Sequence, residues 1–364
     1  MIFNKNMIID EKDKYYFYEN DSFKIYWQGT VFILGKGEGS DSIKEFLRIL
    51  DGKKSVSTST SVLKGHFFIA LFDKRQEKYY FFVDNGGIFQ AYYNDDMVST
   101  DLLCYDESDF DELGVIEFMN LGSTFFDKTL FKGIAKIPGN KILIFDNLLG
   151  GGRLSIIDKA DYSDITDYRD YEYFFYFFDK LKESLRSKKL CLDITGGIDS
   201  RLVLALMYSS DCNCFCAISG VEGIKDIDIA KQVADFFAIE LLITYHGIEG
   251  IENDLELFFD YSEGVCDIVR LHRGFLHNLN RIKKGTDIVI SGSGGELFKD
   301  FWWLQDFPFY NSKHIDFKKL IKYRILPIKV PDFYFTDKYR KLNAQFSSNL
   351  EYDLKKYYIM ETNT

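Results

Sequence analysis

Short apolar runs separated by polar turns dominate the first half of the chain, and they predict an antiparallel sheet. Four runs are rich in β-branched and aromatic residues and are bounded by Gly, Asp or Asn: 23–34, 65–73, 78–84 and 141–146. Apolar residues at helical spacing predict helices over 42–50 and near 111–121. The first half is therefore expected to be a mainly antiparallel α+β domain.

The pattern changes after the glycines at 150–152, where strands begin to alternate with helices. An amphipathic helix is predicted over 171–187. It is followed by a strand (189–194), a helix (200–210), a strand (213–219), a helix (226–238) and a strand (240–245). This alternation predicts an α/β domain with a parallel sheet. The charge-rich stretch 156–170 is interpreted as a linker, so we expect domains over 1–155 and 156–364.

Length and charge narrow the class of protein. A chain of 364 residues suits two domains at ~100–200 residues each. The net charge of -11 argues against nucleic acid and against an anionic membrane surface as partners. No apolar run approaches the ~18 residues that span a bilayer, and the N-terminal residues lack the apolar core of a signal peptide. We therefore expect a cytoplasmic protein.

Cysteine and histidine give little evidence for a metal. The six cysteines form no CxxC pair, so reduced thiols are expected. Cys212, Cys214 and Cys216 share one face of a predicted strand and raise the possibility of a metal, but no further ligands follow at zinc spacing. Small apolar side chains on a buried strand are the favoured interpretation. The five histidines show no metal spacing and suit surface or core positions.

The stretch LCLDITGGIDSRLVLAL (190–206) carries the most chemistry. Gly196 and Gly197 allow a tight turn whose N–H groups converge on an anion at a helix N-terminus, and Thr195 and Ser200 add hydroxyls. Asp199 would repel a phosphate unless a divalent cation such as Mg²⁺ lies between them. The alternative is a glycine turn in which Asp199 and Ser200 cap the helix. The GxxxxGK[ST] phosphate loop is absent from the chain.

Thr-Gly-Gly-Ile-Asp-Ser at 195–200 resembles the Ser-Gly-Gly-Xaa-Asp-Ser loop of the ATP-pyrophosphatases, and the wider pattern resembles asparagine synthetases. Residues 214–241 are similar to the second strand and helix of that synthetase domain. Residues 287–303 resemble its second site loop, and 63–93 and 129–146 are similar to late parts of the family's glutaminase domain. The resemblance implies a glutaminase-like (Ntn-type) α+β domain followed by an adenine-nucleotide α-hydrolase-like α/β domain.

The resemblance also implies a site. Its nucleotide-binding positions are Leu192, Thr195, Gly196, Gly197, Asp199, Ser200, Ser219 and Gly292. Asp199 and Glu296 would hold Mg²⁺, and Asp199, Ser200, Glu296 and Glu263 would be catalytic. The implied reaction is attack of a carboxylate on the α-phosphorus of ATP, which releases pyrophosphate and forms an acyl-adenylate that an amine then converts to an amide.

The chain departs from the family in three places. Ile2 stands where glutaminases have a cysteine whose own amine is the base, so a degenerate glutaminase domain is expected. Ser293 stands where asparagine synthetases carry a Glu, and Glu296 stands where they carry a metal-binding Asp. The C-terminal part is short and matches none of the family pattern, so either the chain is a shortened variant or a protein partner completes the pocket. No catalytic lysine can be chosen by motif, Lys299 included.

Because Ser293 is too weak a base to replace a carboxylate, a nearby acid is needed. Glu263 and Asp267 are the candidates, with Arg270 as an anion partner. The alternative is a solvated helix with internal ion pairs. The sequence thus predicts an ATP-dependent amide-forming ligase for a small-molecule or peptide carboxylate, with ammonia or an amine as donor. A nucleotide-binding, catalytically impaired subunit or sensor of the same fold is the alternative.

Overall fold

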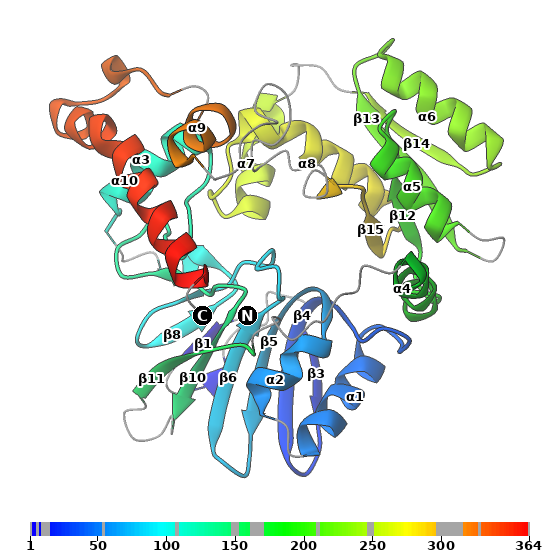
Figure 1. Cartoon of the computed structure of the whole chain (residues 1–364), viewed down its shortest axis with the longest axis horizontal. Helices are drawn as coiled ribbons and strands as arrows, with labels where there is room; N and C mark the ends of the chain where they lie inside the picture. Colours follow the sequence, from blue (N-terminus) through cyan, green and yellow to red (C-terminus); the bar gives the residue numbers. More distant parts are fainter. Residues whose placement is uncertain are drawn as a thin grey trace.

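The computed structural model describes residues 2–4, 7–8, 15–52, 55–105, 109–146, 153–160, 171–208, 212–245, 251–295, 316–326 and 329–362. Two antiparallel sheets lie in the N-terminal part, and a parallel sheet with helices follows (Figure 1). This is the arrangement of sheets that the sequence pattern predicts.

The larger N-terminal sheet has the strand order β11-β10-β6-β5-β4-β3, and every neighbouring pair is antiparallel. Its strands are β3 (Tyr16–Glu19), β4 (Phe23–Phe32), β5 (Lys64–Asp73), β6 (Lys78–Val83), β10 (Lys141–Asp146) and β11 (Arg153–Asp158). The smaller sheet has the order β2-β1-β8-β7-β9. Its strands are β1 (Ile2–Asn4), β2 (Met7–Ile8), β7 (Tyr92–Tyr93), β8 (Met97–Ser99) and β9 (Ala135–Lys136).

The larger sheet is buried on both faces because its side chains alternate between two cores. One face, with Trp27 and Phe82 among its buried side chains, packs against α1 (Ser40–Asp51) and α2 (Val56–Ser59). The other face, with Phe68 and Phe81, packs against Phe3 of β1. The connecting helices of this part are η1 (Thr60–Val62), η2 (Leu102–Tyr105) and α3 (Glu112–Leu121).

The parallel sheet has the order β14-β13-β12-β15. Its strands are β12 (Leu190–Asp193), β13 (Cys214–Gly220), β14 (Leu241–Tyr245) and β15 (Ile288–Ile290), and its helices are α4 (Tyr171–Ser184), α5 (Ile198–Met207), α6 (Lys225–Phe236), α7 (Ile251–Ser262) and α8 (Ile268–Lys283). The chain steps from β12 to β13 to β14 in one direction and then returns to the other side of β12 as β15. In open parallel sheets, ligands bind at the carboxyl ends of strands where such a reversal occurs.

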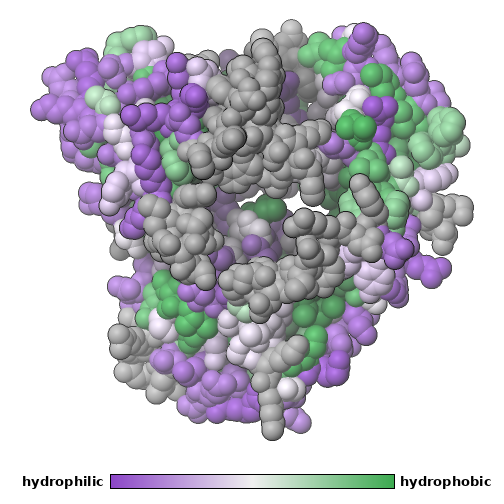
Figure 2. Space-filling view, in the orientation of Figure 1, coloured by the Kyte–Doolittle hydropathy of each residue, from purple (hydrophilic) through white to green (hydrophobic). Residues whose placement is uncertain are grey.

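Helices cover the two faces of the parallel sheet differently. Leu190 and Leu192 of β12 share a core with side chains of α4, α5 and α6. Asp193 faces the opposite side, where it pairs with Arg281 of α8. On the solvent-facing side of α5 and α6, the side chains of Ile198, Leu202 and Phe236 are 65, 49 and 83% exposed. Figure 2 accordingly shows hydrophobic surface over the region of α5 and α6, at its upper right.

The C-terminal helices pack on the N-terminal part. They are α9 (Phe317–Leu320), the π-helical turn η5 (Ile321–Ile325), η6 (Asp332–Tyr334) and α10 (Asp337–Thr362). Phe346 and Leu350 of α10 share a core with Ile116 of α3, and Asn343 accepts a hydrogen bond from Asn120 (2.9 Å). Figure 1 shows α10 beside α3. The sequence interpretation had assigned this segment to the second domain.

The linker interpretation was wrong at its beginning. Residues 153–158 form β11, which pairs along its whole length with β10. The next residue, Lys159, is buried and donates hydrogen bonds from its Nζ to the carbonyl of Val83 (2.6 Å) and to Oδ1 of Asn85 (3.0 Å). Burial lowers the pKa of this amine to about 7. Residues 156–158 thus belong to the first sheet, residues 159–160 follow it, and 161–170 lie outside the described residues.

Within the described ranges, every helix is too short or too polar to cross a bilayer.

Candidate functional site

Residues 195–200, here called the first loop, join β12 to α5 and are held by their own hydroxyls. The backbone N–H of Thr195 donates to Oγ of Ser200 (3.0 Å), and the two side-chain hydroxyls are 3.0 Å apart. The N–H of Gly197 donates to Oγ1 of Thr195 (3.1 Å). Both predicted hydroxyls therefore fix the shape of the turn, and Ser200 is buried beneath it.

The turn ends at an uncapped helix N-terminus. Gly197 occupies the N-cap of α5, and no side chain of the described residues caps it there. The N–H groups of the first turn of a helix lack intrahelical partners and carry the positive end of the helix dipole. Asp199 and Ser200 lie inside α5, so neither occupies its N-cap position. The N-terminus of α5 can accept an anion.

Residues 291–295, here called the second loop, follow β15 and contact the first loop directly. A Cβ added at Gly292 would lie 2.6 Å from the backbone nitrogen of Ser200. A Cβ added at Gly295 would lie 2.6 Å from Cγ and 2.8 Å from Oδ2 of Asp199. The backbone of Ser200 leaves no room for a side chain at position 292, whereas a side chain at position 295 would displace the carboxylate of Asp199. The two predicted loops thus meet, as expected for the carboxyl ends of neighbouring parallel strands.

Asp226 is a neighbour of the first loop that the sequence interpretation missed. A Cβ at Gly196 would lie 2.4 Å from Oδ1 of this residue, which belongs to the first turn of α6. On the other side, Nε of Arg201 donates to the carbonyl of Gly197 (3.2 Å). An acid at the start of the helix after β13 was the available signal, because that helix begins at the same edge of the sheet.

The other predicted nucleotide positions lie on the same strands. Leu192 is buried in the core of β12, next to Ile290 of β15 in the register. Ser219 lies near the end of β13, opposite Thr244 of β14. Glu296, the second predicted metal ligand, directly follows Gly295 but lies outside the described residues, as does Lys299.

Glu263, the predicted base, lies in the connection between α7 and α8. Its carboxylate accepts a hydrogen bond from the backbone N–H of Leu102 in the N-terminal part (2.7 Å). Asp267 caps α8 by accepting from the N–H of Val269 (2.9 Å). Arg270 pairs with Asp267 (3.3 Å) and donates to the carbonyl of Leu121 (2.8 Å). The contacts of Glu263 and Arg270 hold the connection between α7 and α8 against the N-terminal part. The role of Glu263 as a base stays a prediction.

A buried polar cluster lies beneath the first loop. Asp193, at the end of β12, pairs with Arg281 of α8, and Nε2 of His277 lies 3.9 Å from the same carboxylate. Burial raises the pKa of the Asp193 carboxyl, and the pairing with Arg281 partly offsets that rise. His277 also shares a hydrogen bond with Thr244 (2.8 Å). The cluster ties α8 to the end of the strand that carries the first loop.

The predicted cysteine strand is part of the core. Cys216 of β13 is buried, and none of the six cysteines forms a disulfide. Among the residues that the structure describes, no three His, Cys, Asp or Glu side chains are grouped so as to hold a metal ion.

Comparison with protein-family models gave a match to part of the chain. Residues 180–315 match the family model described as asparagine synthase. None of the curated proteins compared with the chain matches it. The matched segment runs from α4 through both loops, and so includes every contact between them described above. The chain therefore carries an asparagine synthase domain over residues 180–315, which is the family that the 195–200 and 287–303 segments resemble.

Proposed function

We propose that the chain is an ATP-dependent amide-forming ligase that activates a carboxylate as an acyl-adenylate and releases pyrophosphate. The asparagine synthase domain indicates an ATP-using amide ligase. The observation that carries the finer proposal is the contact between Gly295 and the carboxylate of Asp199 at the uncapped N-terminus of α5. Backbone N–H groups and an acid at one strand end suit a nucleotide with its metal ion.

The residues of the first loop have separate roles in this proposal. Gly196 and Gly197 let the backbone approach the phosphates. The hydroxyls of Thr195 and Ser200 keep the turn in place through their mutual hydrogen bond. The N-terminus of α5 stabilises the negative charge that develops on the departing pyrophosphate.

The donor set of the first loop fits Mg²⁺. The carboxylate of Asp199 is partly exposed, and hard oxygen donors are the ligands that Mg²⁺ takes. We propose that Asp199 holds this ion together with Glu296. When bound, Mg²⁺ neutralises charge on the phosphates.

The amine comes from outside the chain in this proposal, as ammonia or as an amine of a substrate. We expect the reaction in the cytoplasm. The alternative is a nucleotide-binding subunit or sensor without ligase activity, and Ser293 favours it because a hydroxyl is a weak base.

ATP–pyrophosphate exchange across a panel of carboxylic acids tests the proposal. A ligase exchanges label when its substrate is present, whereas a sensor binds ATP and exchanges nothing. Gly295→Ala is expected to abolish exchange, because its methyl group would collide with Asp199. Gly52→Ala is the control, since Gly52 follows α1 in the other part of the molecule with an ordinary φ of -71°. ATP binding without exchange for any acid would support the sensor instead.

A further inference from the structure

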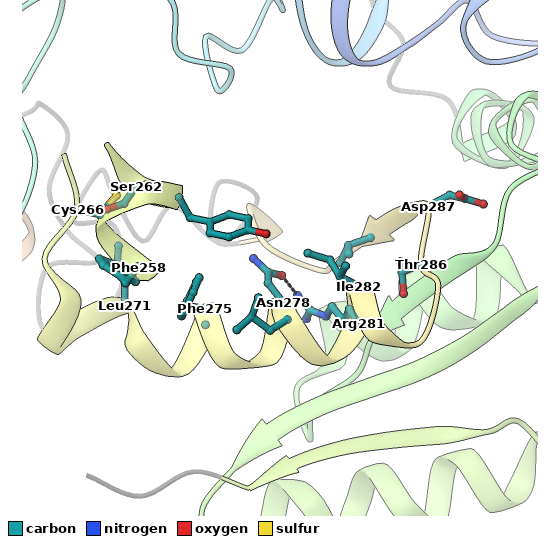
Figure 3. A pocket seen from close by; sticks show the side chains of 14 residues that line it. Phe258, Ser262, Cys266, Leu271, Phe275, Asn278, Arg281, Ile282, Thr286 and Asp287 are labelled. Atoms are coloured by element: carbon teal, nitrogen blue, oxygen red, sulfur yellow. Dashed lines mark hydrogen bonds between the residues drawn. The ribbon is translucent and has the colours of Figure 1, made fainter. Parts of the chain in front are cut away.

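A groove of about 530 Å³ runs along α8, between α7 and β15 (Figure 3). Its volume falls within the range of small-molecule sites, roughly 300–1,000 Å³. The groove, here called the α8 groove, extends at least from Leu271 to Ile282. At ~1.5 Å per helical residue this is about 16 Å, so an occupant would be elongated.

The walls of the α8 groove are mainly apolar. Phe275 of α8 makes edge contacts with two rings of α7, at centroid distances of 5.3 Å to Phe258 and 5.7 Å to Tyr261. Ile282 is 58% exposed, although it lies on the wall of a groove. An apolar ligand body would cover this surface at a gain of ~25 cal/mol for each Å² buried.

Buried polar side-chain atoms without a hydrogen-bond partner among the described residues lie at the two ends of the α8 groove. Oγ of Ser262 at one end, and Nε of Arg281 and Oγ1 of Thr286 at the other, are buried without a hydrogen-bond partner among the described residues. Leaving such a group unsatisfied costs about 1–3 kcal/mol. Three of them on one groove indicate a ligand with polar groups at both ends.

The charge of Arg281 is already balanced. Its Nη2 pairs with Asp193, and its Nη1 donates to Oδ1 of Asn278 (2.7 Å). The remaining Nε–H therefore suits a neutral acceptor, such as a carbonyl or hydroxyl oxygen, rather than a second carboxylate. Arg281 would therefore contact a neutral oxygen of the ligand near Asp193, whereas Ser262 lies at the opposite end of the α8 groove, where the far end of the ligand would be.

The α8 groove and the first loop share the same two strands. Val289 of β15 lines the groove, and Gly292, three residues further along, abuts Ser200. Arg281 joins the groove to Asp193, two residues before Thr195. A molecule in the groove is thus beside the place where the nucleotide would react.

We propose that the α8 groove binds the body of the carboxylate substrate, and that this substrate is an elongated, mainly apolar acid with a neutral polar group at its far end. This inference rests on the proposed ligase function, because it places the reacting carboxylate at the first loop. A compact, highly polar acid of the size of aspartate would leave the groove empty.

Gly274 offers a matched pair of variants. It lies on α8 at the groove, and a Cβ there would have no atom within 4 Å among the described residues. Gly274→Trp fills the groove, whereas Gly274→Ala adds one methyl group. Both replace glycine within a helix, so neither is expected to destabilise α8.

The experiment uses phenylalkanoic acids of increasing length, from 3-phenylpropanoate to 8-phenyloctanoate, with aspartate as the short polar acid. We expect 8-phenyloctanoate to bind by calorimetry with the highest affinity of the set and to support exchange. Gly274→Trp should weaken its binding at least tenfold, whereas Gly274→Ala and ATP affinity should remain near wild type.

The outcomes separate this inference from the proposed function. Exchange with aspartate but no binding of the long acids overturns the groove assignment and leaves the ligase intact. Binding of 8-phenyloctanoate that Gly274→Trp does not weaken also overturns it. Groove binding that is lost in Gly274→Trp, with no exchange for any acid, supports the groove and contradicts the ligase.

Discussion

At the scale of single residues, the question is whether the carboxylate of Asp199 binds a metal ion or has only a structural role. Asp199 lies in the first turn of α5, and its carboxylate lies beside Gly295 of the second loop. Two like charges 4 Å apart repel by about 1–4 kcal/mol near a protein surface, so an acid at a polyphosphate needs a cation between them. The helix alone would tolerate an acid there, because acids at helix N-termini are favourable.

Asp199→Asn is therefore expected to weaken Mg·ATP binding at least tenfold and to leave metal-free ATP binding unchanged or stronger. Calorimetry with Mg²⁺ and with EDTA measures both affinities. Because Asp199 and Glu296 would share one ion, adding Glu296→Gln should cost less than the sum of the two single changes. Equal weakening with and without metal would show that Asp199 acts as a hydrogen-bond acceptor instead.

At the scale of elements, the sequence was most informative where local pattern and topology agree. The alternation of apolar strands and amphipathic helices predicted β12, α5, β13, α6 and β14, and all five are present. A parallel sheet brings strand ends to one edge, so the meeting of the 195–200 and 291–295 loops followed from topology. The glycines at 292 and 295 then allowed the loops to touch.

Elements that depend on distant partners could not be predicted in this way. The short strands of the smaller sheet contain too few residues for a period to appear, and β11 is an edge strand with a mixed Arg-Leu-Ser-Ile-Ile-Asp sequence. The packing of α10 on α3 depends on side chains more than 200 positions apart, such as Asn120 and Asn343. Likewise, the contact of Glu263 with Leu102 has no local signal.

The connection between α7 and α8 gives the prediction at this scale. In Glu263→Gln the amide oxygen can still accept the hydrogen bond from the N–H of Leu102, so the contact between the two parts should remain. If Glu263 is the predicted base, amide formation should be lost in this variant while pyrophosphate exchange and the melting temperature stay near wild type, and that is the expected result. Glu263→Ala is the companion variant, expected to lower the melting temperature by removing the acceptor.

Unchanged amide formation in Glu263→Gln would contradict this expectation and show that Glu263 only positions the connection. The two half-reactions separate these roles, because a base is needed only when the amine attacks the adenylate.

At the scale of the whole molecule, contacts near β4 and near α3 hold the N-terminal part against the parallel-sheet part. Near β4, Phe32 packs in the core of the second part, and Glu38 pairs with Lys188 (2.7 Å). Near α3, Arg270 donates to the carbonyl of Leu121. The N-terminal part thus contacts the parallel-sheet part in both places, which is a structural role.

The last prediction follows from that role: the protein is expected not to hydrolyse glutamine. Ile2 lies in β1 opposite Ser99 of β8, so the start of this strand supplies no nucleophile. Cys104 is close, since its thiol interacts with Ser99, but burial raises the pKa of this thiol to about 11. A thiol with that pKa is almost wholly protonated at neutral pH and is a poor nucleophile. Ammonia release should therefore equal that of a heat-killed control, and iodoacetamide should modify Cys104 slowly at pH 7. Glutamine hydrolysis that Cys104→Ala abolishes would show instead that this buried thiol becomes reactive when substrate binds.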